Sequence, residues 1–144
     1  MRRAGARRGL LVREEVSRTA QHLCDEMRAD GPAAWMNFLA DRDDFYMAAH
    51  GGILFPSRAA TDAFVTEFAP TIQSMDLRWA NERILVLTED RAVFSADWTE
   101  EVTPVQGPST NMAGYFSGLI ERMDAGWRVR TTHGSDLPPP DSSR

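Results

Sequence analysis

The chain has 144 residues, of which 42% are hydrophobic, enough for one domain with a core but not comfortably for two. The formal net charge of -5 argues against a nucleic-acid partner, because phosphate binding needs a basic face. The single cysteine, Cys24, cannot form an internal disulfide, so nothing requires an oxidising compartment. We therefore predict a cytoplasmic protein.

The two ends of the chain differ from its middle. Residues 1–11 carry four arginines, and no hydrophobic segment of targeting length follows them, so we predict a disordered basic arm and no membrane contact. Residues 137–144 contain three prolines and are also expected to be loose. The sequence thus predicts a single folded domain over residues 12–136.

Three helices are expected in the first part of this domain. The first has an apolar stripe with helical spacing, formed by Val16, Ala20, Leu23, Cys24 and Met27. Pro32 follows a glycine and suits the first turn of a short second helix. Ser57 caps a third helix, which carries Ala60, Phe64 and Phe68 on one side and ends at Pro70.

A sheet is expected in the second part. Residues 45–49 have strand character, and after Pro70 the hydrophobic period changes from helical to alternating. Four further strands are predicted, over residues 79–87, 92–102, 111–122 and 127–133. The short links between them imply an antiparallel meander. The sequence therefore predicts an α+β fold, in which N-terminal helices pack on one face of a curved antiparallel sheet.

Three patches of the chain carry a family resemblance. They are residues 44–52 followed by a helix start at Ser57, the hairpin at residues 90–93, and residues 126–129 leading to His133 and Ser135. In this order they resemble the nuclear transport factor 2-like superfamily, the cone-shaped fold of SnoaL-like polyketide cyclases, ketosteroid isomerase and scytalone dehydratase. The resemblance covers about residues 14–136. It implies a deep, mostly apolar pocket between helices and sheet, and a homodimer formed through the outer sheet face.

The chain departs from two known reactions of that superfamily. Ketosteroid isomerase has a catalytic aspartate on the strand before the glycine loop, but residues 47–52 of this chain contain no carboxylate. Limonene-epoxide-hydrolase relatives need an Asp-Arg-Asp set, and alternation does not clearly aim Asp97 at Arg128 or Arg130. The resemblance therefore implies a fold and a pocket, but no particular reaction.

His133 is the leading catalytic candidate. Alternation along residues 127–133 places it on the same side as Trp127, at the end of an apolar face. A histidine can act as general acid or base near neutral pH, and Asp97 is a candidate to orient it. Tyr115 and Asn111 would hydrogen-bond a developing enolate or carbonyl oxygen. The alternative is that His133 is a structural histidine.

Two strands decide which side chains enter the pocket. On residues 111–122, Asn111, Tyr115, Ser117 and Leu119 share one face, and Met112, Phe116 and Ile120 share the other. If the first set lines the pocket, the second is an apolar outer face that would want a dimer partner. On residues 92–102 only one of Asp97 and Trp98 can line the pocket, and alternation alone leaves the choice open.

The remaining predicted ligand contacts are aromatic or lie in a loop. Trp35, Phe45 and Trp98 are expected pocket walls, and His50 lies beside two glycines at the expected mouth. The histidines lack companions at metal-ligand spacing, so we predict no metal, and no cofactor motif occurs. The sequence predicts a protein that binds an apolar small molecule. It is either a cofactor-independent isomerase, cyclase or dehydratase on a carbonyl-bearing substrate, or a non-catalytic ligand-binding or dimerisation module.

Overall fold

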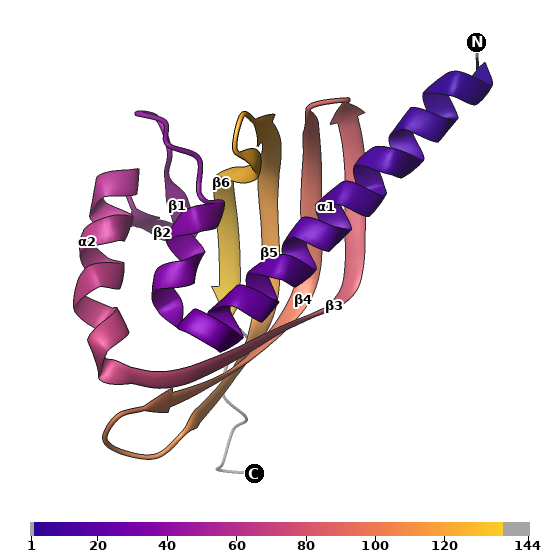
Figure 1. Cartoon of the computed structure of the whole chain (residues 1–144). Helices are drawn as coiled ribbons and strands as arrows, with labels where there is room; N and C mark the ends of the chain where they lie inside the picture. Colours follow the sequence, from indigo (N-terminus) through magenta and orange to yellow (C-terminus); the bar gives the residue numbers. More distant parts are fainter. Residues whose placement is uncertain (1, 137–144) are drawn as a thin grey trace.

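A computed structural model describes residues 2–136, so the predicted C-terminal tail lies outside the described residues. Helices cover one face of a six-stranded sheet (Figure 1). The elements in chain order are α1 (Arg2–Asp30), η1 (Pro32–Phe38), β1 (Met47–Ala49), β2 (Gly52–Phe55), α2 (Arg58–Phe68), η2 (Ala69–Thr71), β3 (Ile72–Thr88), β4 (Arg91–Pro104), β5 (Thr110–Met123) and β6 (Gly126–Asp136). The predicted α+β arrangement is confirmed.

The sheet has the strand order β2-β1-β6-β5-β4-β3. Strands β3 to β6 form the predicted antiparallel meander, and β1 pairs with β6 in parallel. The strand predicted to start at residue 79 begins earlier, at Ile72. Its long first half bends across the lower end of the sheet (Figure 1). The curved sheet therefore leaves a concave side, which the helices cover.

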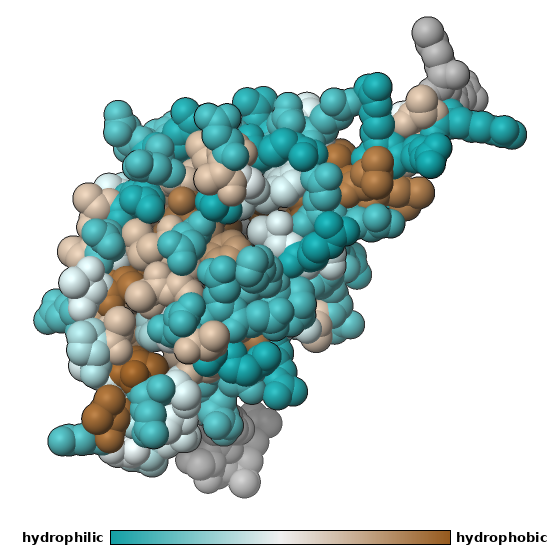
Figure 2. All heavy atoms as spheres, in the orientation of Figure 1, coloured by the Kyte–Doolittle hydropathy of each residue, from teal (hydrophilic) through white to brown (hydrophobic). Residues whose placement is uncertain are grey.

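Helix α1 is longer than the sequence predicts. It begins at Arg2, so residues 2–11 are helical where a disordered arm was expected. Its first turns extend past the sheet (Figure 1), and Leu10 and Leu11 are exposed there, in a region where Figure 2 shows hydrophobic colour. The reason is that arginine, alanine and leucine favour helix, and elongation from an already packed helix is easy. The sequence suggested disorder because residues 1–11 carry positive charge, and that charge does not prevent a helix.

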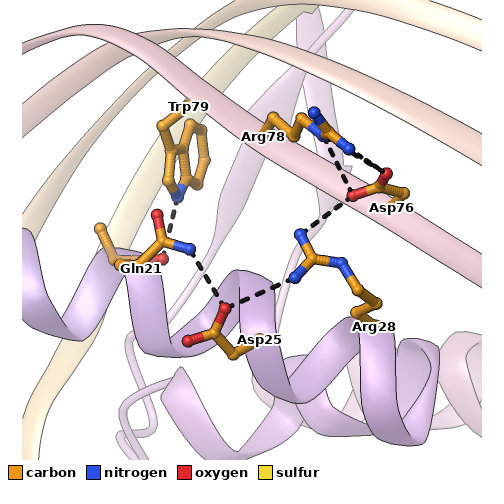
Figure 3. Close-up of polar contacts among 7 residues, drawn as sticks. Gln21, Asp25, Arg28, Asp76, Arg78 and Trp79 are labelled. Carbon is orange, nitrogen blue, oxygen red and sulfur yellow. Dashed lines mark hydrogen bonds and ion pairs between the residues drawn. The ribbon is translucent and has the colours of Figure 1, made fainter.

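Polar contacts fix α1 against β3 (Figure 3). The indole Nε1 of Trp79 donates a hydrogen bond to the Ala20 carbonyl oxygen, 3.0 Å away. The Asp76 carboxylate accepts from Arg78 at 3.0 Å and from Arg28 at 3.1 Å. The hydrogen bond from Arg78, with a second from Arg28, lowers the pKa of Asp76. These contacts hold the Trp79 ring beneath α1, where it reaches the interior of the molecule.

The core lies between α1 and the middle of the sheet. The predicted apolar stripe of α1 is buried, and Val16 and Cys24 are its least exposed members. Val16 belongs to a cluster with Phe94 of β4 and Phe116 of β5, two rings whose centroids are 6.2 Å apart. This packing confirms the helix predicted from spacing and determines which face of each strand points inward.

Helix α2 begins as predicted but buries another side. The Ser57 hydroxyl accepts a hydrogen bond from the Ala60 amide at 3.1 Å, which is the predicted cap. The buried residues are Thr61 and Val65, whereas Phe64 is 48% exposed. The helix packs on η1 and β2 at one end of the sheet. Its two phenylalanines, Phe64 and Phe68, line the cavity described below.

A β-bulge in β6 changes which of its side chains point inward. Leu119 of β5 pairs with Thr131, but the next residue, Ile120, pairs with Val129, so Arg130 is an extra residue in β6. Before the bulge, Val129 is buried; after it, Thr132 is buried and His133 is exposed. The sequence predicted one uninterrupted alternation from Trp127 to His133, and the extra residue makes that prediction wrong.

Candidate functional site

An apolar cavity of about 280 Å³ lies between the concave face of the sheet and the elements η1, α2 and β2. Its aromatic walls are Trp35, Phe55, Phe64, Phe68, Trp79, Trp98 and Phe116. The volume is close to the lower end of the roughly 300–1,000 Å³ typical of small-molecule sites. The size and the walls suit a small, largely apolar ligand.

Glu100 places a carboxyl group in this apolar wall. It follows Phe94, Ala96 and Trp98 on the inward face of β4 and is partly buried. Burial first, and the nearby Asp136 carboxylate second, raise the pKa of Glu100 from 4.5 to about 7. At neutral pH the group is therefore present in both its protonated and its ionised form.

Asp136 lies near Glu100 at one end of the cavity, and His50 lies beside Asp136. Both line the cavity, and His50 Nδ1 is 3.5 Å from an Asp136 carboxylate oxygen. His50 has a φ of 55°, a left-handed backbone conformation that residues other than glycine rarely adopt. The turn between β1 and β2 thus holds the imidazole against the end of β6. The pair makes this end of the cavity polar.

Gly114 of β5 makes room for the Trp98 ring. It pairs with Trp98 on one side and with Asp136 on the other. A Cβ atom at this position would collide with the Ser135 carbonyl oxygen and would stand 2.7 Å from Trp98 Cζ2. Only glycine lets the indole lie across β5 next to the acidic end of the cavity.

Thr132 lies at another point of the wall and carries a buried hydroxyl group. Its residue is 3% exposed, and among the described residues its Oγ1 atom has no hydrogen-bond partner. Thr132 pairs with Gly118 of β5 and Met47 of β1, in the middle of the sheet. The polar groups that the cavity exposes therefore lie at its acidic end, and the Thr132 hydroxyl is buried behind the wall.

Comparisons with known proteins identify the fold. No family model and no curated protein matches the chain, but solved structures do. A proposed scytalone dehydratase from Novosphingobium aromaticivorans has 11% identity and a TM-score of 0.79, with 92% of this chain and 89% of the other covered. The chain has the nuclear transport factor 2-like fold. A superfamily protein of that name from Salmonella enterica has 16% identity and a TM-score of 0.74, with coverages of 94% and 98%.

A third similar structure is a hexachlorocyclohexane dehydrochlorinase. It has 15% identity to this chain and a TM-score of 0.68, with 93% of this chain and 97% of the other covered. These likenesses, together with the element order, confirm the fold that the sequence resemblance implied. At such low identity they establish the fold alone, so the chemistry of the site depends on this chain's own residues.

Three of the predicted ligand contacts line the cavity. They are Trp35, Trp98 and His50. Trp98 answers the question that alternation left open on β4, because Trp98 faces the cavity and Asp97 faces the other side of the sheet. Phe45 lies elsewhere: it is fully buried against Leu39 and Val129 in a separate part of the core.

The predicted catalytic residues lie on the outer face of the sheet. Asp97 pairs with Tyr115, and His133 pairs with the neighbouring Ser117, so the register brings these side chains near one another. Tyr115 is 44% exposed, and His133 and Asn111 are also exposed. The face of β5 predicted to line the pocket is therefore the outer one, because Phe116 and Ile120 are buried against the helices instead.

Sequence reasoning missed Glu100, Asp136 and Thr132. For Glu100 a signal exists: it continues the alternation of Phe94 and Trp98 by one more step, so it is an acidic residue on an apolar strand face. For Asp136 and Thr132 the signal is hidden by the bulge. Their inward orientation depends on Arg130, whose guanidinium lies 2.7 Å from Asp44 and 3.7 Å from Glu121.

Other reactive groups of the described chain do not join the cavity residues. Cys24 is buried in α1, and burial raises the pKa of its thiol to about 11, which keeps it protonated. Across residues 2–136, no group of three or more potential ligands could hold a metal ion. No helix in the same part of the chain is both long and apolar enough to cross a membrane.

Proposed function

We propose that the cavity binds an apolar, carbonyl-bearing small molecule and that Glu100 transfers a proton to or from it. The observation that carries this proposal is a carboxyl group with a pKa of about 7 in an aromatic wall. A group that titrates near the working pH is available as both acid and base. The surrounding aromatic side chains exclude water and so strengthen its interaction with a bound ligand.

The proposed reaction needs no cofactor. The ionised Glu100 removes a proton from a carbon next to the carbonyl group, and the electron pair of that C–H bond moves toward the carbonyl oxygen. The protonated Glu100 then returns the proton to another carbon, which is an isomerisation, or to a departing hydroxyl group, which is a dehydration. One carboxyl group serves both steps because its two protonation states are close in free energy.

The names of two similar structures agree with this class of chemistry. One is a proposed scytalone dehydratase and another a hexachlorocyclohexane dehydrochlorinase, names that denote loss of water and loss of hydrogen chloride. Both kinds of elimination remove a proton from carbon. Because identity is low, the particular reaction of this chain is our proposal and rests on Glu100.

The proposal is tested with a panel of steroids and polycyclic ketones. Thermal shift identifies the compounds that bind the folded protein, and nuclear magnetic resonance in D₂O then follows exchange of the protons next to the carbonyl group. We expect the protons next to the carbonyl group of a bound ketone to exchange faster with wild type than without protein. The rate with His133→Ala should equal the wild-type rate, because the His133 side chain lies on the outer face. Binding without exchange would instead indicate a non-catalytic ligand-binding module.

We also propose that the outer face of the sheet forms a homodimer. Leu85, Val93 and Leu119 are register partners on neighbouring strands, and together they make an apolar row on that face. Leu85 is 60% exposed, and an exposed apolar row on a sheet is a typical self-association surface. This row forms the proposed interface in place of Met112, Phe116 and Ile120, which the sequence predicted.

Sedimentation of wild type and Leu85→Glu tests the proposed dimer. We expect wild type to sediment with twice the mass of the chain and the variant as a monomer, because a dimer would bury the new carboxylate. Leu10→Glu is the matched control, since Leu10 is similarly exposed but lies on the projecting part of α1. A monomeric wild type, or a dimer that survives Leu85→Glu, contradicts the proposal.

A further inference from the structure

The wall of the apolar cavity has an unbalanced charge. It contains two carboxyl groups, Glu100 and Asp136, and among the described lining residues His50 is the single basic side chain. The cross-strand neighbours of Glu100 are apolar, since it pairs with Leu77 of β3 and with Met112 of β5. Two carboxylates near each other in an apolar wall repel one another. A positive charge on a ligand would relieve that repulsion.

The Asp136 carboxyl group lies next to an aromatic ring. Trp98, Gly114 and Asp136 are register partners on β4, β5 and β6, so they form one row across the sheet. Gly114 has no side chain, and the indole ring extends over it: a Cβ atom at position 114 would stand 2.7 Å from Trp98 Cζ2. Trp98 and Asp136 both line the cavity. An indole ring attracts cations more strongly than other aromatic side chains, and a carboxylate pairs with an ammonium group.

A ligand can reach Asp136. Its side chain is 47% exposed, and its separation of 3.5 Å from His50 Nδ1 is longer than the roughly 2.7–2.9 Å of a charge-assisted hydrogen bond, so acceptor positions remain open. Glu100 is the next inward residue of β4 after Trp98, and burial first and the Asp136 carboxylate second raise its pKa to about 7. A cation at Asp136 would therefore lie near Glu100 and favour the ionised form, which is the form that takes a proton.

We propose that Asp136 and the Trp98 ring form a subsite for an ammonium group, so that the ligand of the cavity is an amine with an apolar, carbonyl-bearing body. The ammonium group lies at Asp136, and the body fills the aromatic part of the cavity beside Glu100. The inference rests on the proposed function in using the same cavity, and it adds a positive charge to the class of ligand. A carboxylate or phosphate in the place of the ammonium group would be repelled.

Three naphthalene compounds of similar shape test this inference. At pH 8, 2-naphthylmethylamine is positively charged, 2-naphthylmethanol is neutral and 2-naphthoate is negatively charged. Calorimetric titration in about 0.15 M KCl, which screens long-range attraction to the acidic chain, gives their dissociation constants. We expect wild type to bind the amine about fivefold more tightly than the alcohol, since an ion pair and a cation–π contact at a half-exposed site each contribute modestly. The naphthoate should bind most weakly.

Matched variants assign that preference to Asp136. Asp136→Asn should lose the fivefold preference, while its affinity for the alcohol stays nearly unchanged. Asp136→Glu keeps the charge and should keep the preference. Asp124→Asn is the matched control and should bind like wild type, because Asp124 is exposed in the turn between β5 and β6 and is not a lining residue of the cavity. The ligand-free variants should melt within about 3 °C of wild type, as expected for exposed positions.

The outcomes separate the inference from the proposed function. Equal affinity of wild type for the amine and the alcohol, or a preference that persists in Asp136→Asn, overturns the ammonium subsite. Loss of the preference in Asp124→Asn as well would assign it to the overall charge of the protein, which also overturns the inference. Failure of all three compounds to bind wild type does the same. The proposed function is judged separately, by the exchange of protons in uncharged ketones, and stands if those bind and exchange.

Discussion

Replacement of Glu100 by glutamine is expected to lower turnover of a bound ketone by at least about 100-fold, the lower end of what one general acid or base contributes. Glutamine has almost the same shape but cannot take or give up a proton. The wild-type rate should change with pH around 7, where Glu100 titrates, and Glu100→Gln should lose that dependence. Rates of the two proteins from pH 5 to pH 9 measure both effects.

The same substitution should change how stability depends on pH. Burial raises the pKa of Glu100 from 4.5 to about 7, so the folded state holds this proton more tightly than the unfolded state does. The stability gained from that proton is complete below pH 4.5 and is lost as pH rises to about 7. At about 1.4 kcal/mol per pKa unit, the loss is about 3 kcal/mol. Above pH 7, Glu100→Gln should therefore be the more stable protein by up to this amount.

Urea unfolding at pH 5 and pH 8 measures this difference. The matched control is Glu101→Gln, because Glu101 is the next residue of β4 and is exposed on the outer face. The control should follow wild type in both turnover and stability. If Glu100→Gln is no more stable than wild type at pH 8, or if it retains wild-type turnover, Glu100 does not have the proposed role.

A methyl group at Gly114 is expected to destabilise the protein by about 3 kcal/mol, because overpacking a tight site forces the backbone or a large side chain to move. In Gly114→Ala the new Cβ would collide with the Ser135 carbonyl oxygen and with the Trp98 ring. The first contact opens the pairing of β5 with β6, and the second displaces the cavity wall. We expect the melting temperature to fall by roughly 10 °C, with lower affinity for any cavity ligand.

Gly134→Ala provides the control for that experiment. Gly134 also faces the cavity from β6, but a Cβ at this position would meet no atom within 4 Å. The variant should melt within about 2 °C of wild type, since a methyl group in open space costs little. Equal melting temperatures for Gly114→Ala and Gly134→Ala would contradict the close packing described at Gly114.

The fold could be predicted from the sequence because its signals are local. The spacing along α1, the cap at Ser57 and the alternation after Pro70 each indicate an element from residues that are close together in the sequence. The sequence placed Ala60, Phe64 and Phe68 on one side of α2, but it did not show that Thr61 and Val65 are the buried residues, because their burial depends on how α2 packs on η1 and β2. Local spacing gives an element its period, while its partners determine its orientation.

The site could be predicted only in part, for the same reason. Trp35, Trp98 and His50 were found because aromatic residues and a loop histidine are visible in the sequence. His133 was placed inside because alternation was carried through Arg130, which a bulge adds to the strand. Nothing local marks that bulge, since it depends on pairing with β5 and on the contact of Arg130 with Asp44.

The bulge at Arg130 also affects how sites of this kind can change over time. Loss of Arg130 would restore the regular pairing and leave Thr132 and Asp136 on the cavity side, because all other partners stay the same. If Arg130 were instead taken into the regular pairing, the end of β6 would slip by one residue against β5. His133 and Ser135 would then point into the cavity, and Thr132 and Asp136 would move to the opposite face. Gain or loss of a bulge in one strand thus exchanges the residues of a cavity wall without any substitution, and gives related chains access to new chemistry while the other walls stay intact.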